Sequence, residues 1–351
     1  MFSVEVPPGR AALIRGPAEV ECADGCRVFG GIFRRFSVPP FRQYPVEGPA
    51  AFKIDGGSAA FIEGPAVPQD WDLRLEGVVA LVGPAGSGKS GLSTYMLNAN
   101  VEAGEVCVID ADVGQSDVGP PGFVSCACSR RQVPHISELD PADGYYVGSV
   151  NLQGVEEMLV AGVARCLRRL GAQRLVVINT PGWTSGRGVQ MLRALADAAD
   201  AAVVNLGDRV LPGLSVTRPR YVLPRSPQDR RASRNLSYRR HVRLTARLTA
   251  PADALSVCSW DGALSCPWGR YRPGDVEGPE GRGRDYVVPR DYLRHIFAGL
   301  YRGGRLAGYG VVEKIGREGV ELYASTENFD EIRIGKIRLD PDALEELEPL
   351  P

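Results

Sequence analysis

The chain has 351 residues, of which 44% are hydrophobic and 24% are charged, as in an ordinary folded protein. Lysine plus arginine (41) nearly balances aspartate plus glutamate (42), so the total charge does not indicate a nucleic-acid partner. No stretch approaches the roughly 18 to 20 apolar residues that cross a bilayer, and the first residues lack a secretion signal. We expect two or three domains, no membrane partner, and a cytoplasmic location, or a nuclear one if the source has a nucleus.

Residues 1–70 contain short apolar stretches separated by Gly and Pro, which predicts a small all-β N-terminal domain. The expected strands are Ala11–Ile14, Arg27–Phe33, Ala51–Ile54 and Ala59–Ile62. No pattern in this region indicates chemistry.

Residues 71–248 alternate between short apolar runs and helical patterns, which predicts an α/β domain with a mostly parallel sheet. The runs lack polar alternation, as expected for strands that are buried on both faces. These runs are Val78–Val82, Val106–Ile109, Leu175–Ile178 and Ala202–Asn205. Helical spacing predicts helices over residues 89–103, 152–170 and 189–199.

Residues 249–351 are expected to form a small β-rich C-terminal domain. Residues 269–290 are rich in Gly, Pro and charge, which predicts a loop or linker. His295–Tyr301 and Leu306–Lys314 flank a Gly-Gly turn and predict a β-hairpin. Val320–Ala324 and Ile332–Leu339 add two strands.

Eight cysteines stand at positions 22, 26, 107, 126, 128, 166, 258 and 266. Their spacings do not match the paired C-x-x-C knuckles of a structural zinc site. We expect buried thiols in a reducing compartment. Disulfides are the alternative, because intracellular proteins of some hyperthermophiles contain them, and metal binding is a third possibility.

A phosphate-binding loop follows the first buried strand of the central region. Residues 83–90 read Gly83-Pro84-Ala85-Gly86-Ser87-Gly88-Lys89-Ser90 and match G-x-x-x-x-G-K-[ST] in full. The glycines let backbone N–H groups turn toward an anion, and the next helix adds its positive end. Lys89 can reach the β- and γ-phosphates, and the Ser90 hydroxyl can ligate Mg²⁺. The motif therefore predicts that the chain uses ATP or GTP. A degenerate loop that no longer binds a nucleotide, or binds it without turnover, is the alternative.

Two carboxylates, Asp110 and Asp112, follow the second buried strand. Strand ends on the carboxyl side of such a sheet point at the ligand crevice. One carboxylate can hold Mg²⁺ through water, and the other can accept a proton from an attacking hydroxyl. A solvated acidic turn is the alternative.

Asn179-Thr180-Pro181-Gly182-Trp183 follows the third buried strand. An amide cannot act as a base, so we expect Asn179 to orient water or a phosphate oxygen. Trp183 could stack on a base, and such stacking contributes about 1–3 kcal/mol. A packing role is the alternative for this tryptophan.

The stretch from Arg218 to Arg247 contains ten arginines and one acidic residue, Asp229. Arg230 and Arg234 would share one face of a helix. Such arginines could stabilise the transferring phosphoryl group or bind a polynucleotide backbone. A solvated basic face is the alternative.

These motifs resemble the RNA 5′-hydroxyl polynucleotide kinases of the tRNA, mRNA 3′-end and pre-rRNA processing machineries and their archaeal relatives. The matching elements are GPAGSGKS at 83–90, DADVGQSDVGPPG at 110–122, GYYVGS at 144–149, INTPGW at 178–183 and R-x-x-x-R at 230–234. The resemblance covers most of the chain. It implies a central P-loop NTPase domain, flanked by small β-rich domains, that phosphorylates the 5′-hydroxyl of RNA, or of DNA, in RNA processing or repair.

The resemblance also implies roles for single residues. The loop from Gly83 through Gly91 would hold ATP, or another NTP, and Ser90 and Asp110 would hold Mg²⁺. Asp112 would be the base, with Asp110 as the second choice. Gln115 would contact the substrate or the metal shell, and Thr180, Gly182 and Trp183 would form a clasp for the terminal nucleotide. Arg230 and Arg234 would close over the phosphates as a lid.

Two other functions remain open at this point. A regulatory NTPase switch would use the same loop and carboxylates but would hydrolyse the nucleotide. A scaffold of an RNA-processing complex would bind ATP for structure alone and would have protein partners. The acceptor of the γ-phosphate distinguishes the three.

Overall fold

The structure, a computed structural model, describes residues 1–351. The chain folds into two compact units, each assembled from segments that are distant in sequence. The first unit comprises residues 1–112, 125–142 and 166–233, and the second comprises residues 113–124, 143–165 and 234–351. The expected boundaries after residues 70 and 248 stay predictions.

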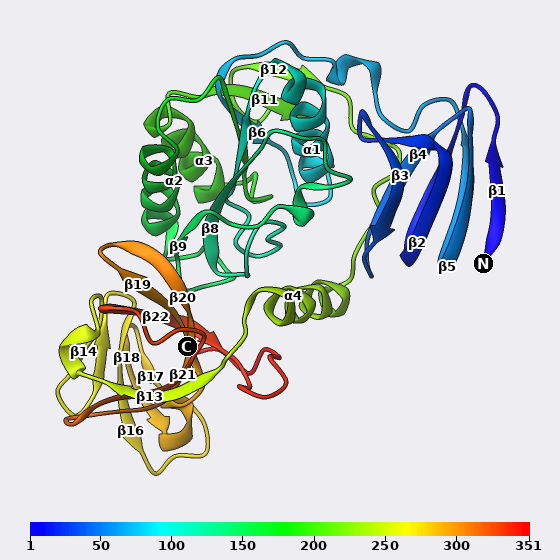
Figure 1. The fold of residues 1–351 in the computed structure, drawn as a ribbon. Coiled ribbons are helices and arrows are strands. Elements are labelled where there is room, and N and C mark those ends of the chain that lie inside the picture. The colour runs from blue at the N-terminus through cyan, green and yellow to red at the C-terminus, as the bar shows by residue number, and fades with distance from the viewer. The chain divides into compact units, whose positions relative to one another are not determined.

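The N-terminal region forms a five-stranded sheet, drawn in blue in Figure 1, and is all-β as predicted. The expected strand Arg27–Phe33 instead contains a turn at Phe29 and Gly30, and the expected strands Ala51–Ile54 and Ala59–Ile62 are parts of one strand. The strands of this sheet are β1 (Phe2–Val6), β2 (Arg10–Val28), β3 (Gly31–Val38), β4 (Gln43–Glu47) and β5 (Ala50–Glu63). The order is β1-β5-β2-β3, and β4 pairs with β2. Buried and exposed residues alternate along much of β2 and β5, so the sheet buries mainly one face.

The central region forms a mostly parallel sheet of the order β12-β11-β6-β10-β7-β8-β9, which confirms the α/β prediction. Its strands are β6 (Gly77–Val82), β7 (Val106–Asp110), β8 (Phe123–Ser129), β9 (Asp143–Tyr146), β10 (Leu175–Asn179), β11 (Ala202–Leu206) and β12 (Leu214–Val216). The strands from β12 to β7 pair in parallel, and β8 pairs antiparallel with β7. Strands β7 and β10 are buried throughout, as their apolar sequences require.

The helices begin and end close to the predicted positions. They are α1 (Lys89–Asn100), α2 (Glu156–Leu170), α3 (Arg187–Ala198) and α4 (Pro227–His241). Helix α1 and helix α3 cover opposite faces of the central sheet (Figure 1). Short 3₁₀ turns complete the connections: η1 (Gln69–Trp71), η2 (Val101–Ala103) and η3 (Ile136–Glu138).

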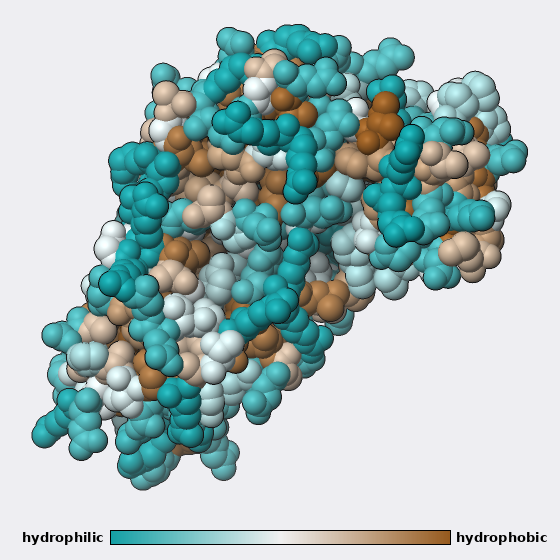
Figure 2. All heavy atoms as spheres, viewed as in Figure 1, coloured by the Kyte–Doolittle hydropathy of each residue, from teal (hydrophilic) through white to brown (hydrophobic).

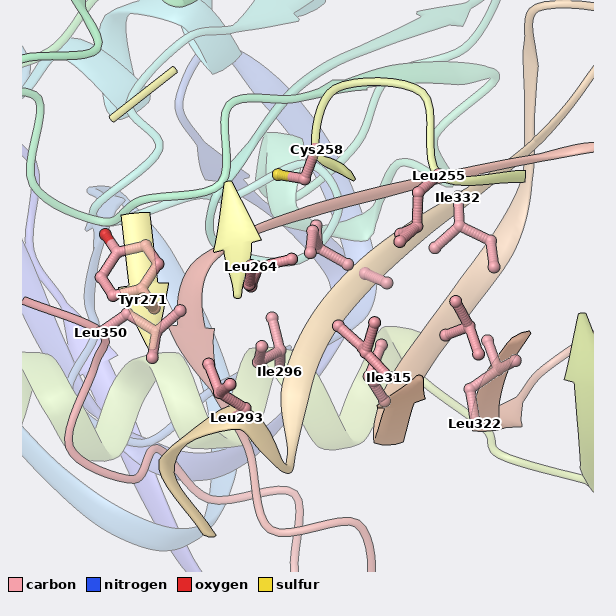
Figure 3. Close-up of a cluster of buried hydrophobic side chains, with 14 of the residues drawn as sticks. Leu255, Cys258, Leu264, Tyr271, Leu293, Ile296, Ile315, Leu322, Ile332 and Leu350 are labelled. Carbon is pink, nitrogen blue, oxygen red and sulfur yellow. The ribbon is translucent and has the colours of Figure 1, made fainter. Parts of the chain in front are cut away.

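The second unit contains the predicted C-terminal hairpin. Strands β19 (Ile296–Arg302) and β20 (Arg305–Gly316) pair antiparallel, and β21 (Gly319–Ala324), β22 (Glu331–Arg338) and β13 (Ala246–Ala250) complete the sheet β13-β21-β20-β19-β22. Its apolar side chains converge with Leu264 and Tyr271 in one core, as Figure 3 shows. This core stabilises the unit by removing apolar surface from water.

The prediction that residues 269–290 form a loop or linker was wrong. They contribute β16 (Gly269–Gly274), β17 (Glu280–Arg282) and β18 (Asp285–Pro289) to a second sheet with β14 (Ser259–Trp260) and β15 (Leu264–Cys266). Tyr271 and Val288 are fully buried. Gly, Pro and charge dominate the sequence because these strands are short and expose one face, so few apolar residues mark them. The turns η4 (Ala252–Ala254) and η5 (Arg290–Leu293) flank this sheet.

The expectation of buried thiols was wrong for six of the eight cysteines. Disulfides join Cys22 to Cys26, Cys107 to Cys128 and Cys258 to Cys266, whereas Cys126 and Cys166 are buried free thiols. Cys107 and Cys128 lie directly opposite each other on β7 and β8. The alternative that the sequence left open, disulfide pairing, therefore applies.

The face of the molecule drawn in Figure 2 is mostly hydrophilic, with apolar residues in small patches. Large apolar side chains that are exposed include Phe2, Ile32, Phe61 and Leu214. None of the helices is both long and apolar enough to cross a membrane.

The disulfides predict the thiol count of the unfolded chain. Without reductant, a thiol reagent should react with two cysteines per chain in denaturant, and with eight after reduction. Reduction should also lower the free energy of unfolding, and the 21-residue span from Cys107 to Cys128 alone contributes about 3 kcal/mol through the entropy of the unfolded chain. Eight reactive thiols before reduction would contradict the pairing.

Candidate functional site

The predicted phosphate loop connects β6 to α1. Gly86 (φ 72°) and Gly88 (φ 101°) adopt left-handed conformations that favour glycine. At Gly83, a Cβ would lie 2.7 Å from Ser87 Oγ and 3.2 Å from the Leu206 carbonyl oxygen, so a side chain would not fit. The glycines are therefore required by the shape of the loop as well as by its function.

Lys89 lies at the start of α1 and is buried, with 6% of its surface exposed. Its Nζ donates hydrogen bonds to the carbonyl oxygens of Gly83 (2.7 Å) and Pro84 (3.1 Å). Burial lowers the pKa of Lys89 to about 8, and the negative charges of Asp112 and Asp110 oppose this shift. The ammonium group thus lies inside the loop and faces both predicted carboxylates.

Asp110 and Asn179 end neighbouring strands and are paired with each other in the β7–β10 register. Asp110 Oδ1 accepts hydrogen bonds from Asn179 Nδ2 (3.0 Å) and from the Asp112 backbone N–H (3.2 Å). Asp110 is fully buried, and Asp112 is half-buried. The strand ends therefore bring the two acids and the amide to one edge of the sheet, as predicted.

Two buried polar atoms beside the loop have no hydrogen-bond partner in the protein. They are Ser87 Oγ, within the loop, and Asn179 Oδ1, at the end of β10. Buried polar atoms normally have a partner, so each of these positions suits a ligand or its water. Mg²⁺ prefers oxygen ligands and retains water, and the hydroxyl of Ser90 and the carboxylate of Asp110 provide oxygens of the type that it binds. The residues therefore fit a magnesium–nucleotide complex.

The segment after β10 reaches the phosphate loop through Gly182. A Cβ on Gly182 would lie 2.5 Å from the Ala85 backbone nitrogen, so this contact requires glycine. Thr180 is fully buried, and its hydroxyl donates to the Leu81 carbonyl oxygen (2.6 Å). The ring of Trp183 packs over Gly188 in the first turn of α3 and stays partly exposed. Trp183 therefore combines a packing contact with a face that a base could use.

Helix α4 carries Arg230 and Arg234, the two arginines predicted to form a lid, one turn apart. It starts at a reciprocal cap in which the Ser226 and Asp229 side chains each accept from the other's backbone N–H. Arg230 belongs to the first unit. Arg234 belongs to the second, where its Nε and NH2 groups donate to the Glu346 carboxylate at 2.5 and 2.7 Å.

Gln115 also belongs to the second unit, where its Nε2 donates to the Gly114 carbonyl oxygen at 2.5 Å.

Two residues near the phosphate loop were not predicted from the sequence. Pro219 packs against Gly88, and the Tyr221 hydroxyl lies beside Gly91. Their segment is irregular and shows no periodicity, so no sequence pattern marks it.

Residues 83–242 match the family model described as the mRNA cleavage and polyadenylation factor CLP1 P-loop. A polyribonucleotide 5′-hydroxyl-kinase of Pyrococcus furiosus is 30% identical over 143 residues, which cover 38% of this chain and 40% of the relative. The polyribonucleotide 5′-hydroxyl-kinase of Thermococcus kodakarensis is 34% identical over 149 residues, which cover 39% of this chain and 42% of the relative. The chain thus spans about two fifths of the length of these curated relatives that it matches.

A more distant relative is the polynucleotide 5′-hydroxyl-kinase NOL9 of Danio rerio, 28% identical over 119 residues, which cover 33% of this chain and 17% of the relative. Among solved structures, Clp1p in a complex with Pcf11p superimposes with a TM-score of 0.66 at 11% identity and covers 96% of this chain and 97% of that chain. At this identity the likeness shows a shared fold.

The matched range contains the phosphate loop, both acids, the Asn179–Trp183 segment and helix α4. The residues that carry the site are therefore the same residues that carry the family match. The region from Gly83 to Val242 is therefore similar to the CLP1 P-loop family.

Proposed function

We propose that this protein is an ATP-dependent polynucleotide 5′-hydroxyl kinase that transfers the γ-phosphate to the 5′ end of RNA, in RNA processing or repair. The observation that carries the proposal is the buried Lys89 ammonium, which is bonded within the phosphate loop and lies near enough to Asp110 and Asp112 for their charges to affect its pKa. The relatives named above as polyribonucleotide 5′-hydroxyl-kinases suggest the substrate class, a polynucleotide 5′-hydroxyl.

The loop residues Gly83 through Gly91 would bind the phosphates through backbone N–H groups, and Lys89 would exchange its bonds to the loop carbonyls for phosphate oxygens. Ser90 and Asp110 would hold Mg²⁺, which neutralises developing charge on the transferring group when bound. Asn179, whose Oδ1 has no protein partner, would orient a water or a phosphate oxygen.

Asp112 is better suited than Asp110 to act as the general base. Asp110 is fully buried and its Oδ1 already accepts two hydrogen bonds, whereas Asp112 is half-buried and can meet a substrate. In the reaction, the 5′-hydroxyl oxygen bonds to the γ-phosphorus, the bond to the bridging oxygen breaks, and ADP leaves. The hydroxyl proton passes to Asp112.

The terminal nucleotide would lie against Gly182 and the exposed part of Trp183, next to the loop. Thr180 would position this segment through the hydrogen bond from its hydroxyl to the Leu81 carbonyl oxygen. Because this hydroxyl is buried, it would not contact the nucleotide directly. Arg230 and Arg234 would act as a lid, and Gln115 would contact the substrate or the water around the metal.

Transfer of label from γ-labelled ATP to a 5′-hydroxyl RNA oligonucleotide, with Mg²⁺, tests the proposed activity. Label should appear on the 5′-hydroxyl oligonucleotide and should not appear on a 5′-phosphorylated oligonucleotide. Lys89→Ala should lose transfer by roughly a thousandfold or more, because it removes a preorganised charge from the transition state. Released phosphate without labelled RNA would instead indicate a regulatory NTPase, and neither product would indicate an ATP-binding scaffold.

The assignment of the base predicts a difference between two isosteric variants. Asp112→Asn should bind ATP nearly as well as the wild type but lose transfer by about 10²–10⁴, because the proton acceptor is gone. Asp110→Asn should lower the transfer rate and should also make the rate less dependent on the Mg²⁺ concentration. Rates and ATP affinities of the two variants, compared over a range of Mg²⁺ concentrations, check this. Full transfer activity in Asp112→Asn would exclude this residue as the base.

A further inference from the structure

A short irregular segment between β12 and α4 lies along the phosphate loop. We call residues 217–222 the strap. Pro219 packs against the loop, since a Cβ on Gly88 would lie 2.5 Å from its Cγ. Val222 lies near Gly86, where an added Cβ would be 3.9 Å from the Val222 Cγ1 atom. The strap therefore follows the side of the loop that leads into α1.

The N-terminal part of the chain fixes the strap at both ends. Asp70 Oδ2 accepts hydrogen bonds from the Thr217 backbone N–H (2.7 Å) and hydroxyl (2.8 Å), and Trp71 Nε1 donates to the Thr217 carbonyl oxygen (2.9 Å). Gln43 Nε2 donates to the Tyr221 carbonyl oxygen at 2.6 Å. With its backbone tied at these points, the strap presents its side chains in a defined direction.

Tyr221 is the strap residue that points at the first turn of α1. It is 4% exposed, and its ring meets the rings of Phe29 and Trp71 edge-on, with centroids 5.1 and 6.4 Å away. Its hydroxyl lies against Gly91, where an added Cβ would be 1.7 Å from the hydroxyl oxygen. The packing therefore places a polar atom beside a glycine at the start of the helix.

The Tyr221 hydroxyl is buried and has no hydrogen-bond partner in the protein. Burial raises the pKa of Tyr221, so the group remains a hydrogen-bond donor at neutral pH. Aromatic packing alone would be served equally well by phenylalanine, and a buried donor without an acceptor is unfavourable. The position of this hydroxyl therefore calls for an acceptor from outside the chain.

The location indicates which part of a nucleotide could accept. The phosphate loop cradles the α- and β-phosphates, and its lysine reaches the β- and γ-phosphates. Gly91 lies two residues beyond Lys89, in the first turn of α1, whose free N–H groups attract anions. The portion of a nucleotide that leaves the loop on this side is the α-phosphate with its ribose.

We propose that the Tyr221 hydroxyl donates a hydrogen bond to the α-phosphate or ribose of the bound nucleotide, and that the strap thereby joins the N-terminal sheet to the nucleotide site. This inference rests on nucleotide binding by the phosphate loop, which is part of the proposed function. It does not depend on the acceptor of the γ-phosphate. Tyr221 is thus a nucleotide-binding residue from a segment outside the phosphate loop.

Binding of ATP and of inorganic tripolyphosphate to Tyr221→Phe, measured by calorimetry, tests the inference. ATP affinity should fall about tenfold, as for loss of one hydrogen bond to a charged or polar acceptor. An equal loss for tripolyphosphate would assign the bond to the α-phosphate, and a loss for ATP alone would assign it to the ribose. The melting temperature of the free variant should not fall, because no protein hydrogen bond is removed.

The matched control is Tyr95→Phe, which removes a hydroxyl from the same aromatic cluster, 6.1 Å from Trp71 between ring centroids. It should bind both ligands as the wild type does. Unchanged ATP affinity in Tyr221→Phe, or an equal loss in both variants, would overturn the inference. Wild-type protein that binds ATP but does not phosphorylate RNA would refute the proposed kinase and leave this result interpretable, whereas failure to bind ATP would refute both.

Discussion

The rest of the site depends on a buried positive charge. An ammonium group that leaves water is costly unless acceptors surround it, and Lys89 satisfies this requirement with two loop carbonyls and two nearby carboxylates. Further along the same loop, Gly86 and Gly88 adopt left-handed conformations that favour glycine. The same geometry that stabilises the lysine therefore shapes an anion site next to a pair of acids. Phosphates that enter would replace the loop carbonyls as oxygen acceptors for the ammonium group.

The strand ends supply the other half of the site. Asp110 and Asn179 occupy paired positions on β7 and β10, so their separation is fixed by sheet hydrogen bonding and depends little on loop conformation. Asp112 follows outside the strand, and the chain then continues into a segment of the second compact unit. Asp110 and Asn179 thus belong to the rigid sheet, whereas Gln115 and Arg234 belong to the other unit. Phosphoryl transfer depends chiefly on positioning, which rigid strand ends provide.

Local patterns predicted much of this arrangement, and distant contacts explain what they missed. The phosphate loop, the buried strands and the acids at their ends could be predicted because each depends on a few neighbouring residues. The sheet within residues 259–289 could not, because its short strands carry few apolar residues. Tyr221 could not be predicted because its position depends on contacts with Phe29 and Gly91, which are distant in sequence. The Cys107–Cys128 pair could not be predicted because it depends on the β7–β8 register. The ion pair of Arg234 with Glu346, 112 residues away, is a contact of the same kind.

In the proposed mechanism, the phosphates of the nucleotide bind to the Lys89 ammonium group. Proton uptake on ATP binding, from calorimetry in two buffers of different ionisation enthalpy, tests it directly. With a pKa of about 8 before binding, Lys89 is mostly neutral at about pH 9 and mostly charged at about pH 7. Bound phosphates favour the charged form, so proton uptake should be larger at the higher pH than at the lower, and it should vanish in Lys89→Met. Equal uptake at both pH values, unchanged in the variant, would contradict the account.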